Sequence, residues 1–226
     1  MELFIKQTLI EKKIPKQRFY DNAQVSSKIK SQFTTIIDTI TLLHKLSEDT
    51  LNISKTDEVE EIFVFFITLK NTNATKNLNL DSVLEVIDKS IPYPILFCID
   101  MGNSYQFKIA NKMRNKVNEH KSVIDIYLFK ETKKESLEEF KVELSQVYNS
   151  LNLKVVYEKL LKIILSKLDD TRNIDELLEL HKKEKLLRYE ISVLEKKVKK
   201  ERQSDKQFYL HKELMQKKEE LKRILE

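Results

Sequence analysis

Two neighbouring segments carry residues whose types and spacing could perform metal-dependent chemistry. Asp100 ends PILFCID, and Gln106 and Lys108 lie in YQFKIAN, just after the turn MGNS. Metal-dependent nucleases of the PD-(D/E)XK type place an aspartate on one strand and an acidic-x-Lys group on the next, where glutamine sometimes replaces the acid. There the carboxylate holds Mg²⁺ and the lysine positions the attacking water. The pattern here is short and has one true carboxylate, and an ordinary turn also explains it. We therefore assign no catalytic residue and keep a divergent nuclease as an alternative.

A basic segment near the C-terminus is the second candidate site. Residues 181–226 contain 15 Lys/Arg and 9 Asp/Glu, whereas the preceding 180 residues contain 26 and 27. Cations at this density can neutralise phosphates without regard to sequence and with strong salt dependence. Lysines that only keep a helical hairpin soluble would give the same pattern. The candidate contacts for nucleic acid or a partner are Lys196, Lys197, Lys199, Lys200, Arg202 and Lys206.

Three further cations could contact an anion or a partner. Lys16 and Arg18 lie in IPKQRFY, residues 14–20, where Pro15 favours a turn and the two aromatic residues are expected to pack onto the following helix. Lys70 ends the apolar segment ITLK, where a chain commonly returns to water. A structural role is the competing interpretation for all three.

Glycine and cysteine counts exclude many familiar chemistries. The only glycine is Gly102, whereas phosphate-binding loops, dinucleotide fingerprints and nucleophile elbows need several glycines. The only cysteine, Cys98, cannot form an internal disulfide, which favours a reducing cytoplasm. The four histidines form no usual zinc spacing. We predict no cofactor and no metal.

The elements that must position these residues alternate between helix and strand up to about residue 130. Apolar residues at 3.6-residue spacing predict an amphipathic helix over residues 25–44, capped by Ser26 or Ser27, and residues 46–58 are expected to form a loop. The segment VEEIFVFFITL is typical of a strand covered on both faces. That segment is residues 59–69, and the further expected elements are a helix at 81–91, a hairpin of strands at 94–100 and 105–111, and a strand at 122–130.

Every segment after residue 130 has a helical pattern. The last run has two apolar registers that do not join, with Ser204 and Gln207 at capping-box spacing between them. We therefore predict two helices, about 174–201 and 205–225, in an antiparallel hairpin; one long coiled coil is the alternative. Such helices could also support a homodimer.

These elements predict an α+β fold with a mostly antiparallel sheet of about four to five strands and covering helices. A helical segment and a C-terminal coiled-coil hairpin follow. The expected domains are 1–130, 131–172 and 173–226. No stretch approaches eighteen uncharged apolar residues, so no membrane span is expected.

The chain resembles the bacterial domain-of-unknown-function family numbered 4391. The motifs that carry the resemblance are IPKQRFY, KLSEDTLNI, VEEIFVFFITLK, IDKSIPYPILF and the basic helical tail. The resemblance implies an accessory companion of helicases and DNA methyltransferases in restriction or phage-defence systems, and it supplies no catalytic residue. Our leading hypothesis is a cytoplasmic, non-enzymatic interaction subunit whose hairpin contacts a helicase-like partner or DNA. A sequence-independent nucleic-acid-binding module is a further alternative.

Overall fold

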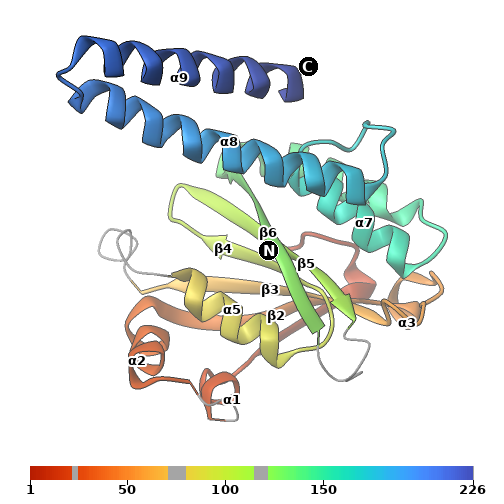
Figure 1. The fold of residues 1–226 in the computed structure, drawn as a ribbon. Helices are drawn as coiled ribbons and strands as arrows, with labels where there is room; N and C mark the ends of the chain where they lie inside the picture. The colour runs from red at the N-terminus through yellow and green to blue at the C-terminus, as the bar shows by residue number, and fades with distance from the viewer. Residues whose placement is uncertain (22–24, 71–79, 115–121, 226) are drawn as a thin grey trace. The chain divides into compact units, whose positions relative to one another are not determined.

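A six-stranded sheet with strand order β1-β2-β3-β4-β5-β6 forms the centre of the fold (Figure 1). The computed structural model describes residues 1–21, 25–70, 80–114 and 122–225. All neighbouring strands pair antiparallel except β3 and β4, which are parallel. The strands are β1 Leu9–Lys13, β2 Ile37–Ser47, β3 Glu61–Leu69, β4 Ile95–Asp100, β5 Ser104–Arg114 and β6 Ser122–Lys133. The α+β class is confirmed, with six strands rather than four to five.

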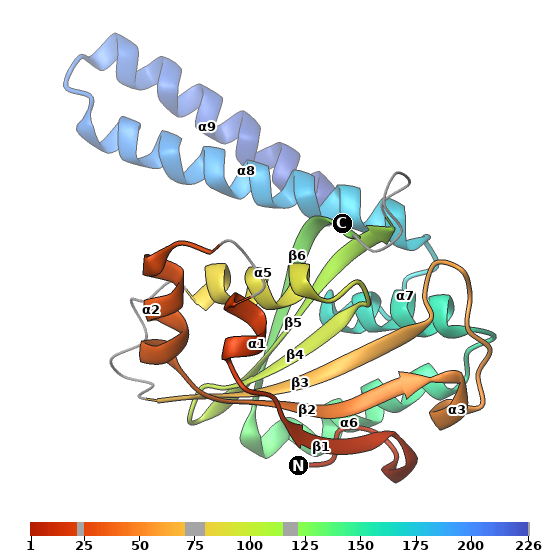
Figure 2. The same cartoon turned by 90° about the horizontal axis from the view of Figure 1, so that it is seen from below.

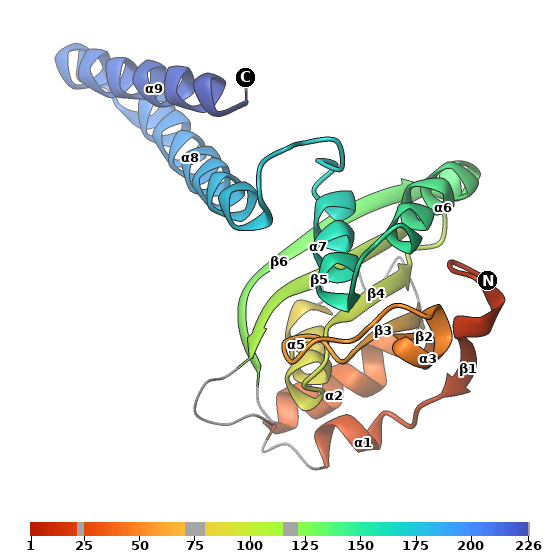
Figure 3. The same cartoon turned by 90° about the vertical axis from the view of Figure 1, so that its right-hand side faces the viewer.

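Helices cover both faces of the sheet (Figure 3). The first group covers one face, and it includes α5, which lies between the parallel strands β3 and β4. The second group follows β6 and covers the other face. The first group is α1 Gln17–Tyr20, α2 Ser27–Ile36 and α5 Leu80–Ser90, and the second is α6 Leu137–Ser145 and α7 Leu153–Ile164. A short helix, α3 Glu48–Leu51, follows β2, and single 3₁₀ turns occur at Lys6–Thr8, Lys134–Ser136 and Gln146–Tyr148.

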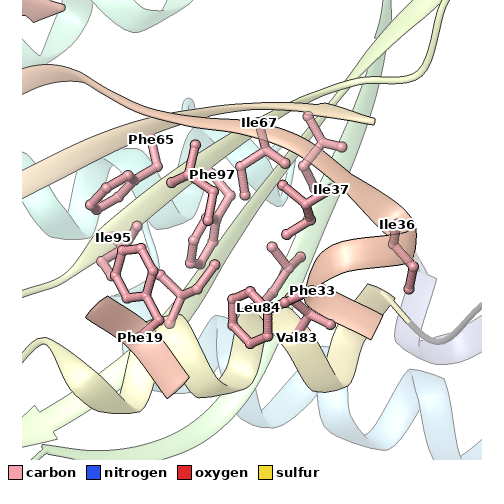
Figure 4. Close-up of a cluster of buried hydrophobic side chains, with 13 residues drawn as sticks. Phe19, Phe33, Ile36, Ile37, Phe65, Ile67, Val83, Leu84, Ile95 and Phe97 are labelled. Atoms are coloured by element: carbon pink, nitrogen blue, oxygen red, sulfur yellow. The ribbon is translucent and has the colours of Figure 1, made fainter. Parts of the chain in front are cut away.

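The apolar core on the α2 and α5 face contains residues from the sheet and from all three helices (Figure 4). Phe65 and Phe97 of the sheet meet Phe19 of α1, and the ring centroids of Phe19 and Phe65 are 6.2 Å apart. Tyr20 packs against Phe33 of α2, with ring centroids 5.3 Å apart. The aromatic residues of IPKQRFY therefore anchor the chain before α2 to the core, as its sequence predicts.

The predicted helix over residues 25–44 is wrong in its second half. Helix α2 begins after Ser26, whose hydroxyl accepts a hydrogen bond from the Ile29 N–H, but it ends at Ile36, and β2 follows directly. Strand β2 has irregular pairing between Ile37 and Thr39 and again between Leu42 and His44. These bulges place buried residues three apart, which imitates helical spacing. The predicted loop at 46–58 also differs, because Ser47 ends β2 and α3 follows it.

The N-terminal residues fold onto β2 through His44. The Leu3 N–H donates to His44 Nε2 at 3.1 Å, and His44 Nδ1 lies 2.9 Å from the Thr8 hydroxyl. Thr8 donates its hydroxyl proton to the Ile5 carbonyl at 2.7 Å, so Nδ1 carries the imidazole proton and Nε2 accepts. Burial lowers the pKa of the fully buried His44 to about 4. The imidazole is therefore a neutral connector between the N-terminus and the sheet.

The chain divides into two compact units, Met1–Asp169 and Asp170–Glu226. The second unit is a hairpin of α8 Ile174–Lys200 and α9 Ser204–Leu225, shown in Figure 2. Leu194 and Leu214 are buried between the helices, and the predicted break between two helical registers is confirmed. Gln207 does not complete the predicted capping box; its side-chain amide donates to the Val198 carbonyl of α8 at 3.1 Å. In the described part of the chain, no helix is long and apolar enough to cross a membrane.

Candidate nucleic-acid interface

The turn between α8 and α9 places the basic segment at one end of the hairpin. The Glu201 N–H donates to the Lys197 carbonyl, and Glu201 Oε1 accepts from the N–H groups of Arg202 and Gln203 at 2.9 and 3.0 Å. These hydrogen bonds lower the pKa of Glu201, with the Gln203 N–H as the largest cause. The carboxylate at the turn is thus occupied by the backbone. We call residues 196–206 the basic tip.

The six cations of the basic tip are all exposed to solvent. Among the described residues, none of these six side chains forms an ion pair, whereas lysines farther along the hairpin do. Glu195, at the base of the tip, pairs with Lys218 at 2.8 Å, and this contact lowers the Glu195 pKa. Lys199 and Lys206 interact at longer range with Glu195 and Glu201, and all six cations face solvent. The six are Lys196, Lys197, Lys199, Lys200, Arg202 and Lys206.

Two exposed aromatic side chains adjoin the basic tip, and sequence reasoning missed their role. Phe208 and Tyr209 have exposed fractions of 68% and 70%. The Gln207 hydrogen bond to Val198 holds this turn of α9 beside the last turn of α8. The signal was available in the sequence, because the apolar register of α9 uses Leu210 and Leu214 and leaves both rings outside it.

Part of the positive charge at the tip also has a structural role. Lys197, Lys199 and Lys200 lie in the last turn of α8, where cations interact favourably with the helix dipole. Such an interaction is worth about 0.3–1 kcal/mol for an exposed side chain. It does not account for Arg202 and Lys206, which lie beyond the end of α8.

Asp100 and Lys108 lie on opposite faces of the sheet. Asp100 pairs with Tyr105, and Phe97 pairs with Lys108, and residues directly across an antiparallel pair share a face while neighbours alternate. Gln106, two residues before Lys108, shares the face of Lys108 and not that of Asp100. A single metal ion cannot join Asp100 to the other two side chains in this arrangement. We therefore do not carry the nuclease hypothesis further.

Asp100 and Lys108 each have another partner. Asp100 Oδ1 accepts from the Gly102 N–H at 2.9 Å and pairs with Lys134 at 3.0 Å. Gly102 adopts a φ of 89°, which the turn into β5 requires and which glycine adopts without strain. Lys108 is buried; its ammonium lies 2.6 Å from Asp81 Oδ1 of α5 and 4.4 Å from the centroid of the Tyr127 ring. Among the described residues, no group of three or more His, Cys, Asp or Glu is placed to hold a metal ion.

A second buried lysine, Lys112, explains the motif IDKSIPYP. Its ammonium lies 2.7 Å from Asp88 Oδ1, and the two side chains have exposed fractions of 2% and 0%. It also donates to the carbonyls of Asp88, Ile91 and Tyr93 at 2.7, 2.8 and 2.8 Å. Lys112 thereby donates hydrogen bonds to backbone carbonyls at the end of α5 and in the segment that leads into β4.

Burying the charges of Asp88 and Lys112 is unfavourable, because both groups lose their contact with water. Burial raises the pKa of Asp88, and Lys112 opposes that rise. Burial likewise lowers the pKa of Lys112, opposed by Asp88. The Tyr157 hydroxyl accepts from the Lys112 backbone N–H at 2.7 Å and donates to the Ala110 carbonyl. Sequence reasoning missed this pair, since the only signal was an aspartate on the apolar face of a helix. The contacts of Lys112 and Asp88 indicate that this pair stabilises the interior of the fold.

Lys16 and Lys70 lie close together in the structure, although 54 positions separate them in the sequence. Lys16 donates to the Ile37 carbonyl at 2.8 Å, where α2 passes into β2. Burial lowers the pKa of Lys16, and the nearby charge of Lys70 lowers it further. Lys16 borders an open cavity of about 270 Å³ and Arg18 does not. The cavity is lined by Lys13, Ile14, Pro15, Lys16, Gln17, Asp38, Thr39 and Ile40. The hydrogen bond to Ile37 gives Lys16 a structural role.

The model of the family described as Domain of unknown function (DUF4391) matches residues 6–221. No curated protein and no solved structure matches the chain.

Proposed function

This chain belongs to the family of the domain of unknown function DUF4391, and we propose that it is an accessory subunit of a DNA-targeting assembly. In this proposal the hairpin contacts nucleic acid. The observation that supports the proposal is the basic tip, whose six cations are exposed and unpaired among the described residues. Phosphate contacts by lysine and arginine supply most of the affinity of sequence-independent binding. The tip offers these cations at one end of the hairpin.

The proposal is tested by neutralising Lys196, Lys197, Lys199 and Lys200 together with glutamine, which is a good helix former. Binding of the full chain to a fluorescent 20-base-pair duplex is measured by anisotropy at several salt concentrations. We expect affinity at moderate salt to fall by about tenfold or more. The slope of log K against log salt should become shallower by up to about 3.6, since each of four lost phosphate contacts removes about 0.9 from it.

A control variant with the same net charge as the tip variant tests whether binding depends on the basic tip or only on the total charge of the chain. It carries glutamine at four exposed lysines of the first unit: Lys12, Lys13, Lys28 and Lys133. We expect this control to keep most of the affinity and of the salt slope. Equal losses in both variants, or no loss in the tip variant, would contradict the proposal.

A protein partner of the same assembly is a second candidate, favoured by exposed apolar residues on α8. Leu186 and Tyr189 have exposed fractions of 57% and 68% and lie outside the register that packs against α9. We propose a helicase or a DNA methyltransferase of a defence system as the partner, as the family resemblance implies. Affinity purification from the native host, with and without nuclease, should retain a protein through Leu186 and Tyr189 after nuclease treatment. Its loss with nuclease, or its retention by a Leu186→Ser/Tyr189→Ser variant, would contradict this candidate.

A further inference from the structure

The aromatic pair beside the basic tip presents flat apolar surface to solvent. The ring centroids of Phe208 and Tyr209 are 6.0 Å apart and their planes meet at 75°, so the two faces point in different directions. A single exposed apolar residue is ordinary, but two adjacent aromatic rings beside unpaired cations are a composition typical of binding surfaces.

Cations flank the two rings in sequence, and the turn of α9 that carries the rings adjoins the basic end of α8. Lys206 precedes them in α9, and Lys212 follows about one turn later. The hydrogen bond from Gln207 to Val198 places them beside the last turn of α8 with its lysines. A ligand at this point meets positive charge and aromatic faces together.

One chemistry matches both features. Phosphates interact with lysine, and bases stack on aromatic rings whatever their sequence. In a duplex the base faces are buried in the stack, whereas unpaired bases expose them. We propose that Phe208 and Tyr209 make the basic tip selective for single-stranded nucleic acid, with unpaired bases stacked on the rings and phosphates bound by the lysines. This inference rests on the proposed nucleic-acid contact and specifies the form of nucleic acid.

The test compares single-stranded and duplex probes on the full chain. The probes are fluorescent 20-mers of deoxythymidine and of uridine, and a 20-base-pair duplex, with binding measured by anisotropy. We expect both single strands to bind at least about fivefold tighter than the duplex. Alanine at Phe208 and Tyr209 should weaken single-strand binding by about tenfold or more, because each base stacked on an aromatic ring contributes substantially. Duplex affinity should change by less than about twofold.

Two further variants keep the result interpretable. Replacing Phe208 and Tyr209 with tryptophan should restore single-strand affinity, because the flat ring is retained. Alanine at Phe129, an aromatic residue of β6 with an exposed fraction of 65%, should leave affinity for all three probes unchanged. Both aromatic positions are exposed, so circular dichroism should show the helical content of the parent.

Different experimental results would contradict different proposals. If the lysine variant loses binding but single strand and duplex bind alike, and the aromatic variant affects neither, the stacking inference is wrong and the phosphate contact stands. If the parent chain binds none of the probes, both proposals are wrong. Tighter binding of the uridine than of the deoxythymidine probe would identify RNA as the preferred strand and supports the inference.

Discussion

Methionine in place of Lys112 should lower the free energy of unfolding by about 3–5 kcal/mol, because it removes the ion-pair partner of the buried Asp88 carboxylate. The three backbone carbonyls that Lys112 satisfies would also lose their donor. The Asp88 carboxylate has no access to water in the folded chain, since its side chain is fully buried. Urea titration followed by circular dichroism measures the change.

A double variant separates the charge from the hydrogen bonds. Asp88→Asn combined with Lys112→Met removes both charges and should recover part of the loss, while the unsatisfied carbonyls keep the variant below the parent in stability. The control Lys89→Met changes a neighbouring lysine with a 60% exposed side chain, which pairs with Glu85 at 2.5 Å on the surface of α5. It should cost no more than about 0.5 kcal/mol. Lys112→Met with parental stability would show that the buried pair does not anchor the fold.

Acidification from pH 6.5 to about 4 should remove about 3 kcal/mol of stability through His44 alone. The pKa of His44 is about 4 in the folded chain against an ordinary value of 6.5. In this range the unfolded chain binds a proton that the folded chain excludes, so stability falls as pH falls and is recovered above pH 6.5. Each unit of difference in pKa corresponds to about 1.4 kcal/mol.

Burial is the main cause of the low pKa, and the hydrogen bonds of His44 also oppose a second proton. A proton on Nε2 would face the Leu3 N–H, so two donors would oppose each other in a buried site. His44→Gln should flatten the dependence of stability on pH between 4 and 6.5 relative to the parent, measured by urea titration at several pH values. Gln at His211, an exposed histidine on α9, is the matched control and should leave the dependence unchanged. A parent and a His44→Gln variant with equal pH dependence would refute the role of His44.

The sequence predicted the elements whose signals are local. The strand β3 is an unbroken apolar run, and the mismatched registers of α8 and α9 showed where the last helix breaks. The hairpin of β4 and β5 followed from Gly102 between two apolar segments. In each case a few neighbouring residues carry the information, and no distant contact is needed to identify the element.

Features that depend on distant contacts were missed or wrong. The bulges of β2 arise from its pairing with β3, and they gave a strand the apparent period of a helix. The Asp100 and Lys108 hypothesis depended on the pairing register, because a shift of one residue moves a side chain to the other face. The Lys112 and Asp88 pair joins residues 24 positions apart and looked like two ordinary surface charges. Strand β6 also continues to Lys133, beyond the expected change to helix at residue 130.

The length of the hairpin has a mechanical consequence. The 27 residues of α8 correspond to about 40 Å of helix, and α9 returns along them with cross-helix ion pairs from Lys183 to Glu220 and from Lys218 to Glu195. The hairpin is therefore a rod of defined length that carries the basic tip at one end. Removing seven residues from each helix would draw that end back by about 10 Å while leaving every residue of the tip in place. The length of the hairpin and the composition of its tip are thus separate properties of this chain, and each can change without the other.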